Sequence, residues 1–354
     1  MMNKSKLNNA NPWLCRFAVL TAVVTFLLIG LGGLVTSHGA GMSVPDWPNT
    51  YGYNMFAFPI SQWVGGIFYE HTHRLLASAV GLLTTILAIW VWLGDSRRWM
   101  KWLAVAAFLG VVAQGVLGGL RVTLKMDSLG VFHATIAQLF FILICAMAVF
   151  TSRSWAELAA SRTKLFVSQG LRTLVLATTV LIFIQLIIAA TMRHQHAGLA
   201  IPDFPTAYGK VWPDMSAAAV AGYNARRVSV TEEAPITAFQ IGLQMVHRLV
   251  AVAITILIAV CAWQAWRRLG GKDPLARLAL FWLALIVAQF ALGAATIWTN
   301  KAADVATAHV MVGALSLVTG ALWCLIGFGR SAGPALESQP VGVFGIQTSM
   351  MVNK

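Results

Sequence analysis

Long apolar stretches alternate with short polar segments along most of the chain, and the polar segments hold most of the charged residues. A helix that crosses the hydrocarbon core of a bilayer needs about 20 mostly apolar residues. Eight stretches meet this requirement, and each predicts one transmembrane helix. They lie at residues 16–36, 71–93, 101–121, 129–151, 171–191, 239–263, 276–297 and 303–327.

The composition agrees with a bilayer as the solvent of this chain. Of its 354 residues, 58% are hydrophobic and 10% are charged, whereas soluble domains carry roughly 25% charged residues. The net charge of +13 comes from basic residues that cluster between apolar stretches. Membrane proteins have such loops on the cytoplasmic side, so no nucleic-acid partner is expected. The first stretch, from Phe17 to about Val35, is longer than the roughly 7–15 apolar residues of a signal peptide and predicts a transmembrane helix.

Alternate loops differ in charge, which indicates the orientation in the membrane. Loop 37–69 contains no Lys or Arg, and loop 192–238 balances its basic residues with acidic ones. The other loops are basic, with groups such as Arg97, Arg98 and Lys101. Because basic loops stay in the cytoplasm, both termini are predicted to be cytoplasmic. No Arg- and Ser-rich transit segment precedes the first helix, which favours a bacterial plasma membrane over an organelle.

The second half of the chain repeats features of the first half in the same order. The matches are Ala40-Gly41 and Pro45-Asp46-Trp47-Pro48 with Ala197-Gly198 and Pro202-Asp203-Phe204-Pro205, His73-Arg74-Leu75 with His247-Arg248-Leu249, Gln114 and Gly118 with Gln289 and Gly293, and His133 with His309. Four predicted helices separate equivalent points, so both copies have the same orientation. We therefore predict an all-α integral membrane protein of eight transmembrane helices, built as two pseudo-symmetric four-helix bundles by a parallel internal duplication.

This duplication defines the predicted domains. Residues 16–151 form the N-terminal bundle, and residues 171–328 form the C-terminal bundle. Three segments are predicted to be cytoplasmic, namely the N-terminus (1–15), the linker (152–170) and the tail (329–354).

Four of the eight histidines lie inside apolar stretches at matched positions: His73, His133, His247 and His309. Ionisable residues in a membrane are costly and usually functional. Each pair falls on the second and fourth helices of its bundle, which run in the same direction, near their outer ends. The two imidazoles can therefore meet at one depth in the bundle core, where facing side chains build cofactor sites.

Paired imidazoles across a helical bundle suit the two axial positions of a haem iron. The alternatives are an interhelical hydrogen bond and a zinc site, which more often has a third ligand. Gly118, Gly119 and Gly293 would let a flat macrocycle approach the helices, although simple helix packing explains them as well. The four cysteines have no CxxC spacing, so they indicate apolar core positions rather than disulfides or a thiolate site.

The two halves differ beside the first histidine of each pair. Glu70 lies three residues before His73 on the same helix face, and Gln244 lies three residues before His247. A carboxylate beside an iron ligand can act as a base or move protons. We therefore predict one reactive site, in the N-terminal half, and one electron-transfer site. The alternative is that Glu70 caps the N-terminus of its helix.

Arg74 and Arg248 each follow a histidine and are predicted to bind the cofactor, because arginine pairs well with carboxylates such as haem propionates. Snorkelling toward lipid phosphates is the alternative. The stiff turns formed by the two Pro-Asp motifs either cover the outer mouths of the bundles or anchor the loops at the membrane interface. The other histidines are unmatched between the halves and are expected at the surface; they are His38, His71, His194 and His196.

The sequence closely resembles the haem A synthase family over about residues 15–328. The residues that carry the resemblance are Gly32-Gly33-Leu34-Val35-Thr36, Ala40-Gly41, Pro45-Asp46-Trp47-Pro48, Glu70 with His73-Arg74, Gln114 with Gly118-Gly119, Phe132-His133, His247-Arg248 and Ala308-His309. Some members carry a cysteine pair in an outer loop, which this chain lacks.

The resemblance implies a membrane oxidoreductase that oxidises the methyl group at C8 of haem O to a formyl group, giving haem A for cytochrome oxidase. It implies that His247 and His309 hold a haem b. It further implies that His73 and His133 take the substrate haem O between them, and that Glu70 is essential to the chemistry.

Expected partners are the lipid bilayer, haem O, an electron donor or acceptor, a haem O synthase as supplier, and a second copy of this chain. Two other functions fit a di-haem membrane protein, a cytochrome b that only carries electrons and a transporter or assembly factor that handles haem. Glu70 favours the enzyme, because a carrier needs no ionisable group beside one iron only.

Overall fold

The computed structural model describes residues 11–160, 167–227 and 234–330. Eight helices in these ranges are long and apolar enough to cross a membrane: α2 (Pro12–Ser37), α3 (Gly65–Gly94), α4 (Arg98–Thr123), α5 (Ser128–Phe150), α7 (Gln169–His194), α9 (Ala238–Leu269), α10 (Pro274–Trp298) and α11 (Ala303–Gly329). Each contains the stretch predicted for it, except that stretch 129–151 runs one residue past the end of α5. The prediction of an all-helical membrane protein with eight spans is confirmed.

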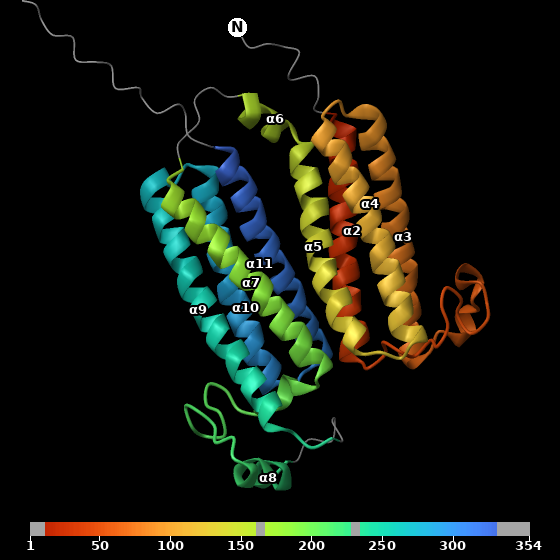
Figure 1. The fold of residues 1–354 in the computed structure, drawn as a ribbon, viewed down its shortest axis with the longest axis vertical. Helices are drawn as coiled ribbons and strands as arrows, with labels where there is room; N and C mark the ends of the chain where they lie inside the picture. Colours follow the sequence, from red (N-terminus) through yellow and green to blue (C-terminus); the bar gives the residue numbers. More distant parts are fainter. Residues whose placement is uncertain (1–10, 161–166, 228–233, 331–354) are drawn as a thin grey trace, which may run out of the picture.

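The eight helices form two groups of four that lie side by side (Figure 1). Helices α2, α3, α4 and α5 pack around one core, which includes Met100. Helices α7, α9, α10 and α11 pack around a second core, which includes Trp282. The groups meet where α7 and α11 contact α2 and α5. At this junction the backbone of α2 lies close to α11. A Cβ atom added at Gly33 of α2 would lie 3.0 Å from Cγ2 of Thr307 on α11.

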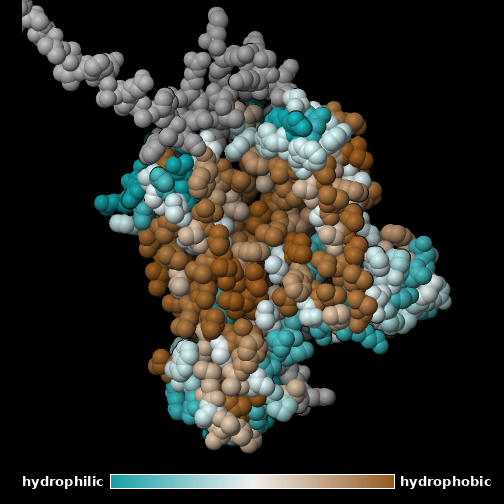
Figure 2. Space-filling view, in the orientation of Figure 1, coloured by the Kyte–Doolittle hydropathy of each residue, from teal (hydrophilic) through white to brown (hydrophobic). Residues whose placement is uncertain are grey.

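A broad hydrophobic surface covers the middle of both groups, and polar residues gather toward the ends (Figure 2). Large apolar side chains within the spans are exposed, among them Leu82, Ile256 and Val287. Apolar side chains of this size are stable on an outer face when the surroundings are lipid. The surface therefore agrees with the membrane assignment made from helix length and composition.

Local capping signals mark the start of several helices. The side chain of Asn11 accepts the N–H of Trp13 (3.0 Å) at the start of α2. Thr237 and Gln240 form a reciprocal capping box at the start of α9, and Asp273 caps α10. These side chains satisfy N–H groups that have no partner within the helix.

Shorter elements lie outside the spans. Helix α6 (Arg153–Ala160) follows α5, and helix α8 (Ala217–Ala225) lies in the long segment after α7. The turns η1 (Met55–Ala57), η2 (Ile60–Gln62) and η3 (Ala197–Leu199) belong to the segments that we call the outer loops, 38–64 and 195–237. Sequence analysis treated all five as loop, because none contains a long apolar stretch. Most of the predicted cytoplasmic terminal segments, 1–15 and 329–354, lies outside the described residues.

Candidate functional site

The four histidines of the predicted haem sites lie on four different helices and line one cavity. His73 belongs to α3, His133 to α5, His247 to α9 and His309 to α11. The cavity has a volume of about 1020 Å³, and its lining comes from both helix groups. Most of the lining residues are apolar or glycine, so a large apolar ligand fits its chemistry.

The rings of His247 and His309 face each other across the second group, with centroids 6.4 Å apart and planes at 66°. Two bonds of about 2 Å on opposite sides of a metal ion separate the bonding nitrogens by about 4 Å, and roughly 1 Å more on each side reaches the ring centres. The observed spacing therefore fits two axial ligands of one iron.

Glycines on neighbouring helices make room for three of these imidazoles. A Cβ atom at Gly32 would lie 3.2 Å from Cε1 of His73, and one at Gly293 would lie 3.2 Å from Cε1 of His309. The same construction at Gly118 gives 3.4 Å to Cε1 of His133. The close backbone approach restricts the rings and keeps the space beside them open for a ligand.

Hydrogen bonds between helices do not explain three of the four imidazoles. Nδ1 of His73, His247 and His309 is buried and has no hydrogen-bond partner among the residues that the structure describes. His133 differs, because it has a partner in Gln114. With the amide nitrogen of Gln114 turned toward His133, this nitrogen donates to Nδ1 (3.1 Å) and to the main-chain oxygen (3.2 Å) of His133. Neutral imidazoles without competing partners fit the donor set of a haem iron better than the hydrogen-bond alternative.

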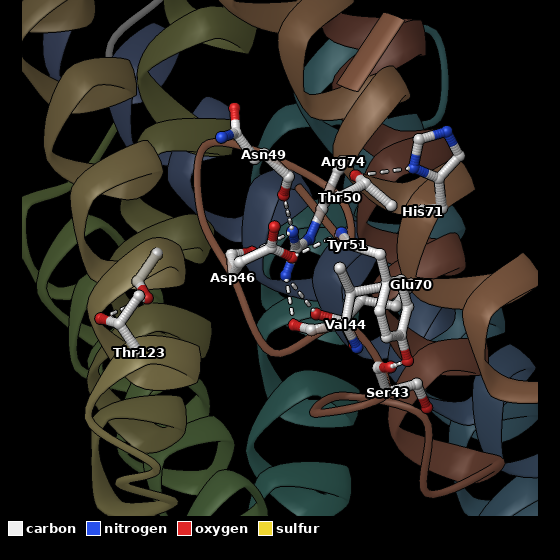
Figure 3. A network of polar contacts seen from close by, with 11 residues as sticks. Ser43, Val44, Asp46, Asn49, Thr50, Tyr51, Glu70, His71, Arg74 and Thr123 are labelled. Atoms are coloured by element: carbon white, nitrogen blue, oxygen red, sulfur yellow. Dashed lines mark hydrogen bonds and ion pairs between the residues drawn. The ribbon is translucent and has the colours of Figure 1, made fainter. Parts of the chain in front are cut away.

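Glu70 is buried, and it holds the outer loop that follows α2. Its Oε2 accepts the main-chain N–H of Val44 (2.8 Å), and its Oε1 forms an ion pair with Arg74 (2.7 Å) (Figure 3). Arg74 also donates to three main-chain oxygens of this loop. Helix α3 begins at Gly65 and has no side-chain cap, so Glu70 does not cap it. The carboxylate instead joins the loop to the cavity wall, which it also lines.

The second group makes corresponding contacts without a carboxylate. Oε1 of Gln244 accepts the main-chain N–H of Ile201 (2.7 Å). Arg248 donates to the main-chain oxygens of Asp203 (2.7 Å) and Thr206 (2.9 Å). Both arginines predicted to bind the cofactor therefore hold outer loops in this structure.

The turns formed by the two Pro-Asp motifs lie against the cavity. Trp47 and Pro48 of the first loop line it, and so do Phe204 and Pro205 of the second. The indole N–H of Trp298 donates to the main-chain oxygen of Phe204 (3.2 Å), which fixes the second turn on α10. Of the two interpretations made from sequence, this placement favours covers over the cavity.

A network of hydrogen bonds to an aspartate orders each turn. Tyr51 and Gly52 donate main-chain N–H groups to the carboxylate of Asp46, each at 2.8 Å. Burial alone would raise the pKa of Asp46, but these donors and the charge of Arg74 lower it below its usual value. The pKa of Asp203 is also lowered, since a hydroxyl and two main-chain donors of its own loop outweigh burial. Both carboxylates are therefore ionised and structural at neutral pH.

The expectation that His71 and His194 lie at the surface is wrong. His71 is fully buried, its Nδ1 lies 3.2 Å from Oγ1 of Thr50, and aromatic rings of the outer loop surround it. His194 lines the cavity. His38 and His196 are exposed, as expected.

Arg121 and Arg193 also line the cavity, although no motif in the sequence singles them out. Each lies in the last turn of a helix, where arginine is common because it can snorkel to the interface. Their only signal in the sequence is the lack of an equivalent, since neither is matched in the other half.

Comparison with known proteins places this site in a family. The family model described as "Cytochrome oxidase assembly protein" (COX15-CtaA) matches residues 15–321. The chain belongs to this family. The matched range includes Glu70 and all five histidines that line the cavity, so the family similarity covers the whole candidate site.

Several similar proteins carry the name Heme A synthase. The protein of Geobacillus kaustophilus is 28% identical over 300 residues, which cover 82% of this chain and 83% of the relative. That of Halalkalibacterium halodurans is 24% identical over 308 residues, or 86% and 93% of the two chains. That of Rhizorhabdus wittichii is 26% identical over 347 residues, or 88% and 92%. The family resemblance inferred from the sequence motifs is confirmed.

Proposed function

We propose that this chain is an oxidoreductase that converts haem O to haem A, for cytochrome oxidase, by oxidising the C8 methyl group to a formyl group. One observation carries the proposal, a single cavity lined by two histidine pairs and one carboxylate in a chain of this family. The name of the relatives supports the reaction. A pure electron carrier would not account for the acidic neighbour of only one pair.

We assign His247 and His309 to a resident haem b, which these two imidazoles would hold, because their ring spacing leaves room for a metal ion between them and the adjacent Gln244 cannot ionise. His73 and His133 are assigned to the substrate haem O, beside Glu70. When bound, a haem b supplies one-electron chemistry. The glycines and apolar side chains of the cavity provide the flat, water-poor space that both ligands require.

Glu70 is assigned the role of proton acceptor at its carboxylate oxygens. It lines the cavity, and its contacts with Val44 and Arg74 hold it in one position. The same contacts hold the outer loop against α3. The carboxylate of Glu70 therefore keeps this position only while the loop lies over the cavity. The covering turns then keep bulk water from the reacting methyl group.

We propose that the chain lies in the bacterial plasma membrane with both termini in the cytoplasm. The corresponding contacts of Glu70 and Gln244, and of Arg74 and Arg248, support a parallel internal duplication. A haem O synthase as supplier, an external redox partner and a second copy of the chain remain proposed partners.

Pigment analysis tests the proposed function. Membranes of a strain that makes haem O but not haem A should contain haem A when this chain is produced in them. Haem b alone, from a folded protein, would contradict the proposal and favour the electron carrier. A matched strain that produces His73→Ala should accumulate haem O, because the substrate would lose one of its two ligands.

A further inference from the structure

The cavity wall carries an excess of positive charge. Its charged lining residues, among those that the structure describes, are four arginines and a single carboxylate, Glu70. Glu70 pairs with Arg74, and Arg248 donates to loop oxygens. The other two arginines of the wall are Arg121 and Arg193. Neither of them makes the contacts with an outer loop that account for Arg74 and Arg248. An uncompensated cation in a low-dielectric cavity is costly unless an anion joins it.

Arg193 reaches from α7 across the junction between the helix groups. Its Nη2 donates to the main-chain oxygen of Gly33 (2.6 Å) and to Oγ of Ser37 (2.8 Å), both on α2. Both acceptors are neutral, and both bonds come from one nitrogen. A guanidinium group has five N–H donors, and Arg193 also lines the cavity, so a ligand there can reach donors that these two bonds do not use.

Arg121 comes from the last turn of α4 and lies flat on the backbone at Gly41. Its ion pair with Asp127 is long, at 3.3 Å, and that carboxylate is 58% exposed. Its Nε is buried without a hydrogen-bond partner. A buried donor of this kind costs free energy until an acceptor reaches it, and a half-exposed carboxylate on one side of the guanidinium does not provide one.

The two guanidinium groups act within one electrostatic environment. Arg121 and Arg193 are close enough to repel each other. The charge of Arg121 also reaches His73 and His133, and that of Arg193 reaches His309. Both arginines line the cavity that holds the two histidine pairs, Arg121 from α4 of the first helix group and Arg193 from α7 of the second.

We propose that Arg121 and Arg193 form a carboxylate-binding site between the two helix groups, which takes propionate groups of the haems held by the histidine pairs. Arginine binds carboxylates through two parallel N–H donors, and both residues have donors to spare. Two haems bring four carboxylates, which offset the excess of positive charge in the wall. The proposal rests on the proposed function only in requiring that the cavity binds haem.

The test uses the purified full-length protein, loaded with haem at both histidine pairs. Haem transfer to excess apomyoglobin should be roughly 10- to 100-fold faster for Arg121→Gln and Arg193→Gln, as expected when a charge-assisted hydrogen bond is lost. Resonance Raman spectra should show shifted propionate bending bands in the same variants. Arg193→Lys, which keeps the charge, should transfer haem at an intermediate rate. Arg268→Gln, at an exposed arginine outside the cavity, should match the unaltered protein in both measurements.

Asp127→Asn distinguishes the proposal from a purely structural ion pair. If the function of Arg121 is its ion pair with Asp127, then Arg121→Gln and Asp127→Asn should accelerate haem loss equally. If Arg121 binds a propionate, Asp127→Asn should slow haem loss or leave it unchanged. Unshifted propionate bands in both Gln variants would overturn the proposal. The proposal would also be overturned if the Gln variants lost a bound phospholipid while their propionate bands stayed unchanged. The ligand of the two arginines would then be a lipid phosphate. A protein that keeps these responses but makes no haem A would refute the enzyme, not the carboxylate site.

Discussion

Glu70 and Gln244 show how a single residue separates the two helix groups. Both side chains accept a main-chain N–H of an outer loop, at 2.8 Å from Val44 and at 2.7 Å from Ile201. The structural task can therefore be done by a neutral amide. A carboxylate at one of the two places adds the capacity to accept a proton, which a loop anchor does not need.

Replacing Glu70 with Gln should stop haem A formation while the fold survives. The amide oxygen can still accept the N–H of Val44, as Gln244 does for Ile201, and Arg74 keeps its bonds to the loop oxygens, so the protein should fold with a lower melting temperature from the lost ion pair. Loss of a general base should lower the rate by roughly 10²- to 10⁴-fold. Pigment analysis of the purified variant should find haem O or a hydroxylated intermediate.

The reverse substitution, Gln244→Glu, is the control and should not create a second reactive site. Normal haem A yield from a folded Glu70→Gln protein would reduce Glu70 to a loop anchor.

The second histidine pair should control the resident haem b. His247→Ala or His309→Ala should abolish its low-spin absorption spectrum, because the iron would lose an axial ligand. Truncation should leave the helices in place, since Nδ1 of both rings makes no hydrogen bond. The spectrum of the purified variants measures the effect, with His38→Ala, at an exposed histidine, as the control. An unchanged spectrum in both variants would remove the haem b site from the second group.

The sequence revealed the site residues that lie in the middle of apolar stretches and hid those at their ends. A histidine such as His133 is conspicuous between apolar neighbours, because the membrane makes it costly. Arg121 and Arg193 were hidden, since arginine at a helix end has an ordinary explanation. The burial of His71 was also hidden, because it depends on Thr50 and on aromatic rings of a loop that folds back over α3.

At the scale of elements, the spans were predictable and the outer loops were not. The length of a span is set by the thickness of the hydrocarbon core, so an apolar stretch of about 20 residues is enough to predict one. The shape of the outer loops follows from contacts such as Tyr51 with Asp46 and Tyr208 with Asp203, which depend on the exact turn. The sequence showed that the two Pro-Asp motifs match, but it left two interpretations of their place.

Acidification should loosen the two outer turns. The pKa values of Asp46 and Asp203 are lowered in the folded protein, by main-chain donors that outweigh burial. Their stabilising effect is thus complete above the unfolded pKa of about 3.9 and is lost as pH falls through the lower folded pKa. Hydrogen-exchange protection factors in segments 46–52 and 203–209, which correct for the pH dependence of intrinsic exchange, should be high at pH 5–7 and fall below about pH 4.

The double variant Asp46→Asn, Asp203→Asn should lose this acid dependence, because amide side chains do not titrate in this range. An acid response of the same size in the double variant would assign the effect to other groups.

At the scale of the whole molecule, one cavity is lined by both helix groups, which also share a small hydrophobic core that includes Phe141 and Ala314. The groups contact each other through α2, α5, α7 and α11, and Arg193 ties α7 to α2 at this junction. The sequence indicated two similar halves, but the halves alone do not determine how they dock. That arrangement depends on small residues at the contact, such as Gly33 opposite Thr307.

The orientation of the whole molecule is the last prediction. Both outer loops leave the helix groups at the end opposite α6 (Figure 1), and basic residues such as Arg97 and Arg268 belong to the α6 end. Because basic loops are retained in the cytoplasm, reporter fusions after Trp47 and near Ala218 should be active outside, and fusions at Ser96 and Lys272 inside. Ala218 decides most, since its loop follows five spans and a parallel duplication requires it on the same side as Trp47. An inside signal at Ala218 with an outside signal at Trp47 would contradict the parallel arrangement of the two halves.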